Sequence, residues 1–546
     1  MLMRRLLALA AVLALSASAA SAQEPPVQDQ DPLPRVPPGF LVTPYAAVEG
    51  TPVSLDWGPG PGGTDVLYVA DNLGGRILAY PDVGGAVAGR PAVFASGFGG
   101  PLGVLATGDG TVYVADSTGT RSGPFGNRNY GRVWRVRDAN GDGVGETREV
   151  VLNDLPNGRH NTNGMAIGGD GMLYIANGNS TDDGVLGGQT EAVPWSGAVV
   201  RVDPAATGLS LADLEEEDAL IATGMRNLFD VAFSPFDETK LFIPTNGIDD
   251  AGGGATPDLE DSDDLLHLTD TDDLRQKKDP VTGELLFDED GNPIMEPVID
   301  HMGFPSCLWN AAKRGNMEPY NNPNPNVISA FGPCDEDTVT QPVASFGLHV
   351  SADGLAFQET DAWGEEFEND LFVAEFGNFF GDEVVGHEVV RVELSGDGER
   401  VERVSEFLTD ATALDVTFDD AGSLYVAAYG GTIFKVQQAA DVPAVIDVEI
   451  NGWQFLPQAL VIPEGTTVRW TNREQVLPSA HKVTSVQAVT PDGASEGDEI
   501  NSADLPVGAS HTYRFEHPGT WNYTCTVAQL HTAVMHGQII VVPAGS

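Results

Sequence analysis

The chain has 546 residues, of which 41% are hydrophobic, and carries a formal net charge of −52 at pH 7. This length and apolar content allow two or more packed domains. The charge argues against binding to nucleic acid or to an anionic membrane surface, because phosphate groups require a basic protein face. Acidic residues are spread along most of the chain, so we interpret them as solvated surface.

The first 22 residues have the pattern of a secretory signal. Arg4 and Arg5 precede an apolar run at 6–15, and residues 20–22 supply the small residues of a cleavage site. A short membrane anchor is the alternative, but the run falls short of the ~20 residues that span a bilayer. No later segment is apolar enough to span. We therefore expect a secreted or periplasmic protein without a membrane span.

From residue 40 to 438, after a linker at 23–39, one strand pattern recurs. Each copy has a turn with Gly or Asp, a short apolar strand and then an acidic or small residue, and several are followed by a second strand. The six copies lie at 66–69, 112–114, 173–175, 241–243, 371–373 and 424–426. This recurrence predicts a six-bladed β-propeller. A β-sandwich or several small β-domains is the alternative.

Two insertions interrupt the pattern, at 258–299 and 318–326, and we expect both to be loops. The acidic run at 258–273 belongs to the first. The segment 138–146 resembles a calcium loop, but its carboxylates do not complete the twelve-residue pattern, so we interpret it as a tight turn.

A different pattern follows a short linker at 439–444 and occupies residues 445–543. Strands are expected at 447–450, 466–470, 511–515, 520–523 and 538–542. This arrangement predicts a small Greek-key β-sandwich, so the whole chain is expected to be all-β.

The three cysteines are an odd number for an exported protein, in which disulfides persist. Cys307 and Cys334 both lie beside turn residues and form the natural pair. Cys525 is then left unpaired, and its surroundings suggest a reason. His531 and Met535 follow it on one loop, and His481 supplies a second imidazole. A thiolate, two imidazoles and a thioether are the ligand set of a trigonal copper site with a weak axial sulfur.

The C-terminal residues resemble the plastocyanin and azurin family of cupredoxins over nearly all of 445–543. The resemblance rests on the stretches 455–457, 463–468, 470–472, 518–525 and 531–537. It implies a type 1 copper site, and the closing His-x3-Met-x-Gly is most similar to azurin. Two features depart from the family: five residues separate Cys525 from His531, and His481 follows Asn472 at a long interval.

Three propeller segments, at 158–165, 224–227 and 246–250, lie at predicted blade boundaries and resemble the soluble glucose and sorbosone dehydrogenases. That resemblance spans roughly 95–437 and implies pyrroloquinoline quinone (PQQ) and calcium as cofactors. It implies that His160 is the general base, since imidazole titrates near working pH, and that Arg226 and Asn227 contact the quinone.

In the same resemblance Gly247, Asp249 and Asp250 offer oxygens to calcium. The chain departs from the family at 375–381 and 412–416, which lack the expected basic residues. The plainer interpretation is that His160 is an ordinary loop histidine and that Arg226 and Asn227 bridge two blades.

We hypothesise an exported oxidoreductase that oxidises a sugar-like or alcohol substrate, passes electrons to the copper and then to a redox partner protein. The alternative is a non-enzymatic blue-copper carrier whose propeller docks a partner. A propeller hydrolase such as a lactonase would need a metal site that Asn163, Asn227 and Asp415 do not convincingly form.

Overall fold

The computed structural model describes residues 33–542 apart from a set of internal segments. These segments are 83–87, 89–90, 124–125, 182–184, 187–188, 191–194, 249–260, 280–281, 289–290, 312–316, 323–326, 328–333, 336–337, 379–383, 475–479 and 490–499. The expected signal at 1–22, most of the linker at 23–39, and Asp249 and Asp250 lie outside the described residues. The described part of the chain holds no helix with the length and hydropathy needed to cross a membrane.

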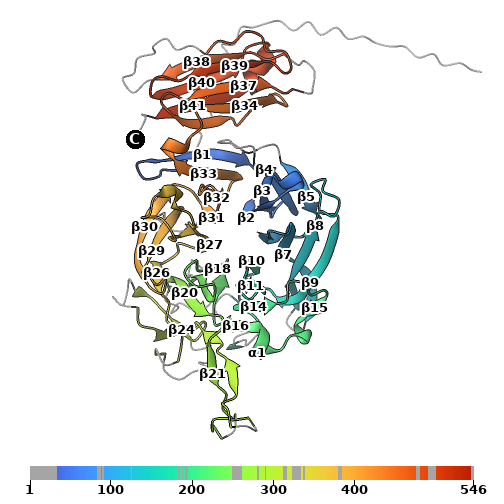
Figure 1. Ribbon diagram of the computed structural model, residues 1–546, viewed down its shortest axis with the longest axis vertical. Helices are drawn as coiled ribbons and strands as arrows, with labels where there is room; N and C mark the ends of the chain where they lie inside the picture. The colour runs from blue at the N-terminus through green and yellow to red at the C-terminus, as the bar shows by residue number, and fades with distance from the viewer. Residues whose placement is uncertain are drawn as a thin grey trace, which may run out of the picture. The chain divides into compact units, whose positions relative to one another are not determined.

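Six sheets, each of four or five strands, are arranged around a centre (Figure 1). Blade 1 contains β2 (Pro52–Pro59), β3 (Asp65–Asp71), β4 (Arg76–Pro81) and β5 (Ala92–Ser96). Blade 2 contains β6 (Pro101–Ala106), β7 (Thr111–Gly123), β8 (Gly126–Arg137), β9 (Thr147–Pro156) and the short β15 (Leu209–Ser210). Blade 3 contains β10 (Thr162–Ile167), β11 (Leu173–Asn177), β14 (Ala198–Val202), β16 (Leu220–Thr223) and β23 (Asp300–His301).

The remaining three blades also follow one another in chain order, except that β1 belongs to the last. Blade 4 contains β17 (Asn227–Leu228), β18 (Ala232–Phe233), β19 (Lys240–Asn246), β20 (Asp264–Asp270) and β26 (Ala344–Gly347). Blade 5 contains β27 (Ala352–Phe357), β28 (Leu371–Glu375), β29 (Glu388–Leu394) and β30 (Val401–Thr409). Blade 6 contains β31 (Ala413–Phe418), β32 (Leu424–Ala428), β33 (Thr432–Gln438) and β1 (Phe40–Ala47). The predicted six-bladed propeller is therefore confirmed.

The N-terminal strand completes the last blade. β1 pairs antiparallel with β33 from Phe40 opposite Gln438 to Ala47 opposite Thr432. Strands from the two ends of the propeller sequence thus share one sheet, which closes the ring.

Each of the six predicted apolar strands lies in a different blade. They belong to β3, β7, β11, β19, β28 and β32. β11, β28 and β32 are buried at every position. Each blade packs between two others, so apolar clusters contain residues of adjacent blades, as Tyr68 and Val114 do. Burial on both faces explains the continuous apolar runs in the sequence.

Polar side chains of the innermost strands join one blade to the next. Asp415 accepts a hydrogen bond from the backbone N–H of Leu55 at 2.6 Å, which links blade 6 to blade 1. The Asn163 amide donates to the carbonyl of Leu228 at 2.8 Å, which links blades 3 and 4. Both residues therefore serve as inter-blade links in this structure.

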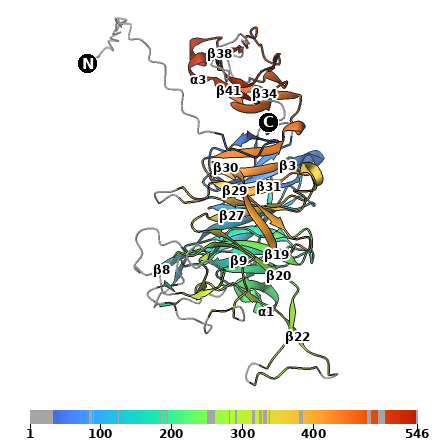
Figure 2. The same cartoon turned by 90° about the vertical axis from the view of Figure 1, so that its left-hand side faces the viewer.

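The first insertion differs from the expected loop. β20 occupies Asp264–Asp270 and pairs with both β19 and β26 inside blade 4. Its first four residues are buried, because Leu265 and Leu266 belong to apolar clusters and Asp264 accepts backbone N–H groups. The loop interpretation of 258–273 is wrong over these residues. Further along, β21 (Leu274–Gln276) and β22 (Met295–Pro297) form a hairpin that extends beyond the blade sheets (Figure 2).

Five smaller elements lie between residues 185 and 321, outside the six blade sheets. They are α1 (Glu216–Ala219), β12 (Val185–Leu186), β13 (Gln189–Thr190), β24 (Cys307–Leu308) and β25 (Tyr320–Asn321). The predicted disulfide between Cys307 and Cys334 is present, with Cα atoms 5.7 Å apart.

The C-terminal residues form two four-stranded sheets. One has the order β35 (Gln454–Leu456), β34 (Val445–Asn451), β37 (Thr467–Asn472) and β39 (Ser510–Arg514). The other has the order β36 (Ala459–Pro463), β41 (His536–Val542), β40 (Gly519–Cys525) and β38 (Val483–Val489). One apolar core joins the two sheets, with Val468 and Trp470 from the first and Trp521 and Ile539 from the second. This is the expected β-sandwich.

Candidate metal centre and propeller site

Three of the predicted copper ligands converge inside the sandwich. Cys525 ends β40, His531 lies on the short helix α3 (Gln529–Val534), and His481 bridges to Leu505 just before β38. The Cys525 Sγ lies 3.6 Å from Nδ1 of His481 and 3.4 Å from Nδ1 of His531. All three side chains are buried.

Met535, the fourth predicted ligand, follows α3 directly. Its backbone N–H donates to the carbonyl of His531 at 2.8 Å, and its own carbonyl accepts from the Thr524 hydroxyl at 2.6 Å. The side chain is 1% exposed and belongs to the same apolar core as Cys525. The loop therefore holds Met535 in the apolar core that also contains Cys525.

This donor set fits a metal ion. Two ligand atoms that each lie about 2.0–2.3 Å from one metal are themselves separated by distances like those observed here. Cys525 is the unpaired cysteine, and the backbone N–H of Lys482 points at its sulfur at 3.4 Å, as suits a thiolate acceptor. A soft thiolate with two imidazoles favours copper or zinc, and a buried methionine in the same core favours copper.

The two imidazoles differ in what surrounds them. Burial lowers the pKa of His481, and the nearby His531 lowers it further, whereas Glu474 acts in the opposite direction. The His531 ring lies 4.7 Å from the indole of Trp453, between ring centroids, and its Nε2 has no hydrogen-bond partner among the described residues. Neutral imidazoles are the form that binds a metal.

In the propeller, the structure brings His160, Arg226, Asn227 and Gly247 to the same end of blades 3 and 4. The loop residue Asn179 connects the first two. Its carbonyl lies 2.9 Å from Nδ1 of His160, and its backbone N–H donates to the carbonyl of Arg226 at 2.6 Å. Asn227 pairs with Asn246, the neighbour of Gly247, at the end of β19.

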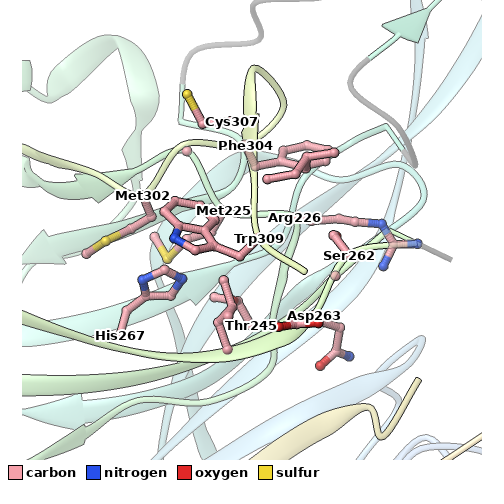
Figure 3. A pocket seen from close by; sticks show the side chains of 15 residues that line it. Met225, Arg226, Thr245, Ser262, Asp263, His267, Met302, Phe304, Cys307 and Trp309 are labelled. Atoms are coloured by element: carbon pink, nitrogen blue, oxygen red, sulfur yellow. The ribbon is translucent and has the colours of Figure 1, made fainter. Parts of the chain in front are cut away.

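A pocket opens beside these residues, and Arg226, Asn246 and Gly247 contribute to its lining. Figure 3 shows the Trp309 indole next to the His267 imidazole, with Arg226 beside Ser262. His267 is 1% exposed, and burial lowers its pKa to about 3, so the imidazole is neutral. Neither its Nδ1 nor the indole nitrogen of Trp309 has a hydrogen-bond partner among the described residues. The sequence analysis did not single out Trp309.

Buried carboxyl groups accompany Arg226 at this end of the propeller. Burial raises the pKa of Asp264 to about 6, opposed by the N–H groups of Gly247 and Ser351 and by the charge of Arg226. Burial also raises the pKa of Asp353 and Glu375 well above the usual range. Glu375 stands at the start of 375–381, where the family resemblance expected basic residues.

The fit to PQQ is therefore incomplete. The buried Arg226 guanidinium suits one planar carboxylate. The cofactor carries three carboxylates, and the described residues of 375–381 and 412–416 contribute buried carboxyls rather than cations. Gly247 uses its N–H to bind Asp264, at 2.6 Å.

The segment 138–146 gathers more carboxylates than a plain turn requires. Oxygens of Asp138, Asp142 and Glu146 lie within 4.8 Å of one another. Asp138 accepts backbone N–H groups from Gly141 and Gly143, each at 2.7 Å, as in a tight turn.

The C-terminal sandwich matches a known protein family. Residues 442–542 match the model of copper binding proteins of the plastocyanin/azurin family. This part of the chain is a cupredoxin domain. No curated protein matches this sequence at a significant level. Residues 68–219, in the propeller, match a domain of unknown function (DUF7133).

Solved structures of other proteins share the fold of the propeller that precedes the cupredoxin domain. An iodide structure of Trichoderma reesei Carbohydrate-Active Enzymes Family AA12 is 17% identical and covers 76% of this chain and 99% of its own, with a TM-score of 0.57. The holo form of the pyranose dehydrogenase PQQ domain from Coprinopsis cinerea is 14% identical and covers 74% and 97%, with a TM-score of 0.55. At these identities the likeness establishes the fold.

Two residues of the cupredoxin domain were missed by the sequence analysis. Glu474 and Trp453 both contact the ligand histidines. Glu474 is one acidic residue among many, and Trp453 lies in a turn far from the ligand motif in sequence. Only the fold brings them to the site.

Proposed function

We propose that the chain is an exported oxidoreductase in which the propeller oxidises a sugar-like or alcohol substrate and a type 1 copper in the cupredoxin domain receives the electrons. The observation that carries this proposal is the convergence of His481, Cys525 and His531 in a chain whose propeller shares the fold of a sugar-oxidising enzyme domain. A redox partner protein then reoxidises the copper.

Copper, when bound, supplies a one-electron acceptor that cycles between Cu(II) and Cu(I). The chain's own residues prepare its site. The Cys525 sulfur, the imidazoles of His481 and His531 and the Met535 thioether would hold the copper, and their burial excludes water. The fusion keeps this acceptor at a high effective concentration for the propeller, because only a short linker separates the two.

His160 is the proposed base for the substrate hydroxyl. Because a carbonyl only accepts, the contact with Asn179 favours the tautomer of His160 with its proton on Nδ1, in which Nε2 is the basic nitrogen. Oxidation of an alcohol to a carbonyl releases two electrons and two protons, so a two-electron acceptor such as PQQ, with calcium, is the proposed cofactor. Arg226 and Asn227 would contact it. The charge fit of the described residues to this cofactor is incomplete.

The test is an absorption spectrum of the full chain with Cu(II), before and after PQQ, calcium and a panel of sugars and alcohols are added. We expect an intense thiolate-to-copper band near about 600 nm that bleaches only with cofactor and substrate together. Cys525→Ser should lose the band. His160→Ala should keep the band but not its bleaching, whereas a variant of the exposed His517 should keep both.

A non-enzymatic electron carrier is the second candidate, and one observation favours it. Glu375 begins the stretch where the family resemblance expected basic residues, and Asp264 and Asp353 are further buried carboxyls at this end of the propeller. A band that appears but bleaches with none of the substrates, while an external reductant bleaches it, would support the carrier. Absence of the band would refute the copper site itself.

A further inference from the structure

A buried carboxylate lies against the copper-ligand set of the cupredoxin domain. Glu474 follows β37, and its side chain is fully buried, as is that of His481. The backbone N–H of Glu474 donates to Oδ1 of Asn472 at 2.9 Å. The Asn472 amide in turn donates to the carbonyl of Leu505 at 2.7 Å, and Leu505 pairs with the backbone of His481. This chain of bonds ties the backbone of Glu474 to the backbone of His481.

The His481 ring lies between the thiol and this carboxylate. Nδ1 faces the Cys525 sulfur at 3.6 Å, and Nε2 lies 3.4 Å from Oε2 of Glu474. That second distance is long for a hydrogen bond. Nε2 has no closer polar partner among the described residues, so Glu474 is the group placed to accept its proton. A histidine that binds metal through one nitrogen carries its proton on the other.

The same oxygen holds a second element of the site. Oε2 of Glu474 accepts the backbone N–H of Trp453 at 2.9 Å. Trp453 adopts a left-handed φ of 61°, and its indole packs against His531. Oε2 of Glu474 therefore faces two N–H groups and is placed to accept from both. Glu474 therefore touches one ligand histidine directly and the other through Trp453.

We propose that Glu474 is a positioning residue of the copper site, which orients His481 with Nδ1 toward the metal and stabilises Cu(II) relative to Cu(I) through its buried negative charge. This inference rests on the copper site of the proposed function. A buried charge is screened less than an exposed one, and a fixed anion favours the more positive metal ion. A carboxylate that receives the second N–H of a ligand histidine also raises the basicity of that ligand.

The experiment compares the copper reduction potentials of the wild type, Glu474→Gln and Glu516→Gln as full-length, copper-loaded proteins. Potentials are measured by titration against one-electron mediators while the band near about 600 nm is followed. Glutamine keeps the size of the side chain and one acceptor oxygen but removes the charge. We expect Glu474→Gln to shift the Cu(II)/Cu(I) equilibrium toward Cu(I) at least tenfold, which is about 59 mV for one electron.

Glu516→Gln is the matched control. It removes the same charge from the same domain, but Glu516 is 62% exposed and paired with Arg514 at 3.3 Å. Solvent screens such a charge, so we expect a change of less than about twofold. A Glu474→Gln potential that matches the control would overturn the role of Glu474 and leave the copper site intact. Absence of the band in the wild type would overturn both.

A measurement on the wild type covers the case in which Glu474→Gln does not fold. In the diamagnetic Cu(I) form, the Nε2–H proton of His481 should give a resonance that is protected from exchange with water, because it faces a buried acceptor. Rapid exchange of that proton would overturn the inference without any variant.

Discussion

Replacement of Asp264 by asparagine tests whether a buried, protonated carboxyl stabilises the propeller. Asp264 is 3% exposed. Its Oδ1 accepts the N–H of Gly247 at 2.6 Å, and its Oδ2 accepts the N–H of Ser351 at 2.8 Å, which joins blade 4 to the start of blade 5. Burial raises its pKa from 3.8 to about 6. The folded protein therefore holds this proton more tightly than the unfolded chain does.

The sign and size of the effect follow from that difference. The folded-state pKa lies above the unfolded value, so the stability contributed by the proton is complete below about pH 4 and is lost as the pH rises toward about 6. A shift of roughly 2 pKa units corresponds to about 3 kcal/mol. The amide of the variant does not titrate. The free energy of unfolding of the wild type should thus fall relative to that of Asp264→Asn by about 3 kcal/mol between about pH 4 and pH 7.

The assay is denaturant unfolding of the propeller, followed by circular dichroism from acidic to neutral pH. An amide satisfies only one of the two N–H groups, which lowers the stability of the variant by about 1–3 kcal/mol at every pH. That constant offset does not change how the difference in unfolding free energy between the wild type and the variant depends on pH. Repulsion from the net charge of −52 affects both proteins and largely cancels in this difference. Asp420→Asn, an exposed change, is the control and should follow the wild type. Parallel curves for the wild type and Asp264→Asn would refute the reasoning.

Three further predictions concern the disulfide and the cupredoxin domain. A Cβ added at Gly537 would lie 2.2 Å from Cζ of the buried Tyr523, so Gly537→Ala should destabilise the domain by about 1–3 kcal/mol in denaturant unfolding; a loss below about 0.5 kcal/mol would contradict this packing. Replacing both Cys307 and Cys334, which are 27 residues apart in sequence, by serine should lower the stability of the propeller by about 3–4 kcal/mol, and an unchanged unfolding midpoint would count against it. Copper at a hundredfold excess over its dissociation constant should stabilise the domain by about 2.7 kcal/mol, and Cys525→Ser should lose this increment in calorimetry.

The propeller could be predicted because its signal is local and repeated. Each blade carries one strand buried on both faces, so the chain shows a short apolar run such as 173–175 or 424–426 at every repeat. The copper ligands could be predicted for a similar reason, since three of them share one loop between Cys525 and Met535. Both patterns need few assumptions about distant parts of the chain.

β20 could not be predicted in the same way, because its acidic residues have uses that composition does not reveal. Asp264 turns inward to bind backbone N–H groups, and the neighbouring Asp263 accepts the Ser345 hydroxyl at 2.7 Å. An acidic run therefore mixes buried acceptors with solvated charges. The same holds for Glu474, whose contacts with Trp453 and His481 depend on how β35 and β37 approach the ligand loop.

The pairing of β1 with β33 has a consequence for how the protein is made. The partner of β1 follows it by almost 400 residues in the sequence, so the ring cannot close until nearly the whole propeller is available for folding. Such a late, long-range pairing slows folding and leaves strand edges open to wrong partners in the meantime. The cupredoxin domain follows immediately in the sequence and depends on pairings within its own hundred residues. We therefore expect the two domains to finish folding at nearly the same time, although the propeller begins several hundred residues earlier.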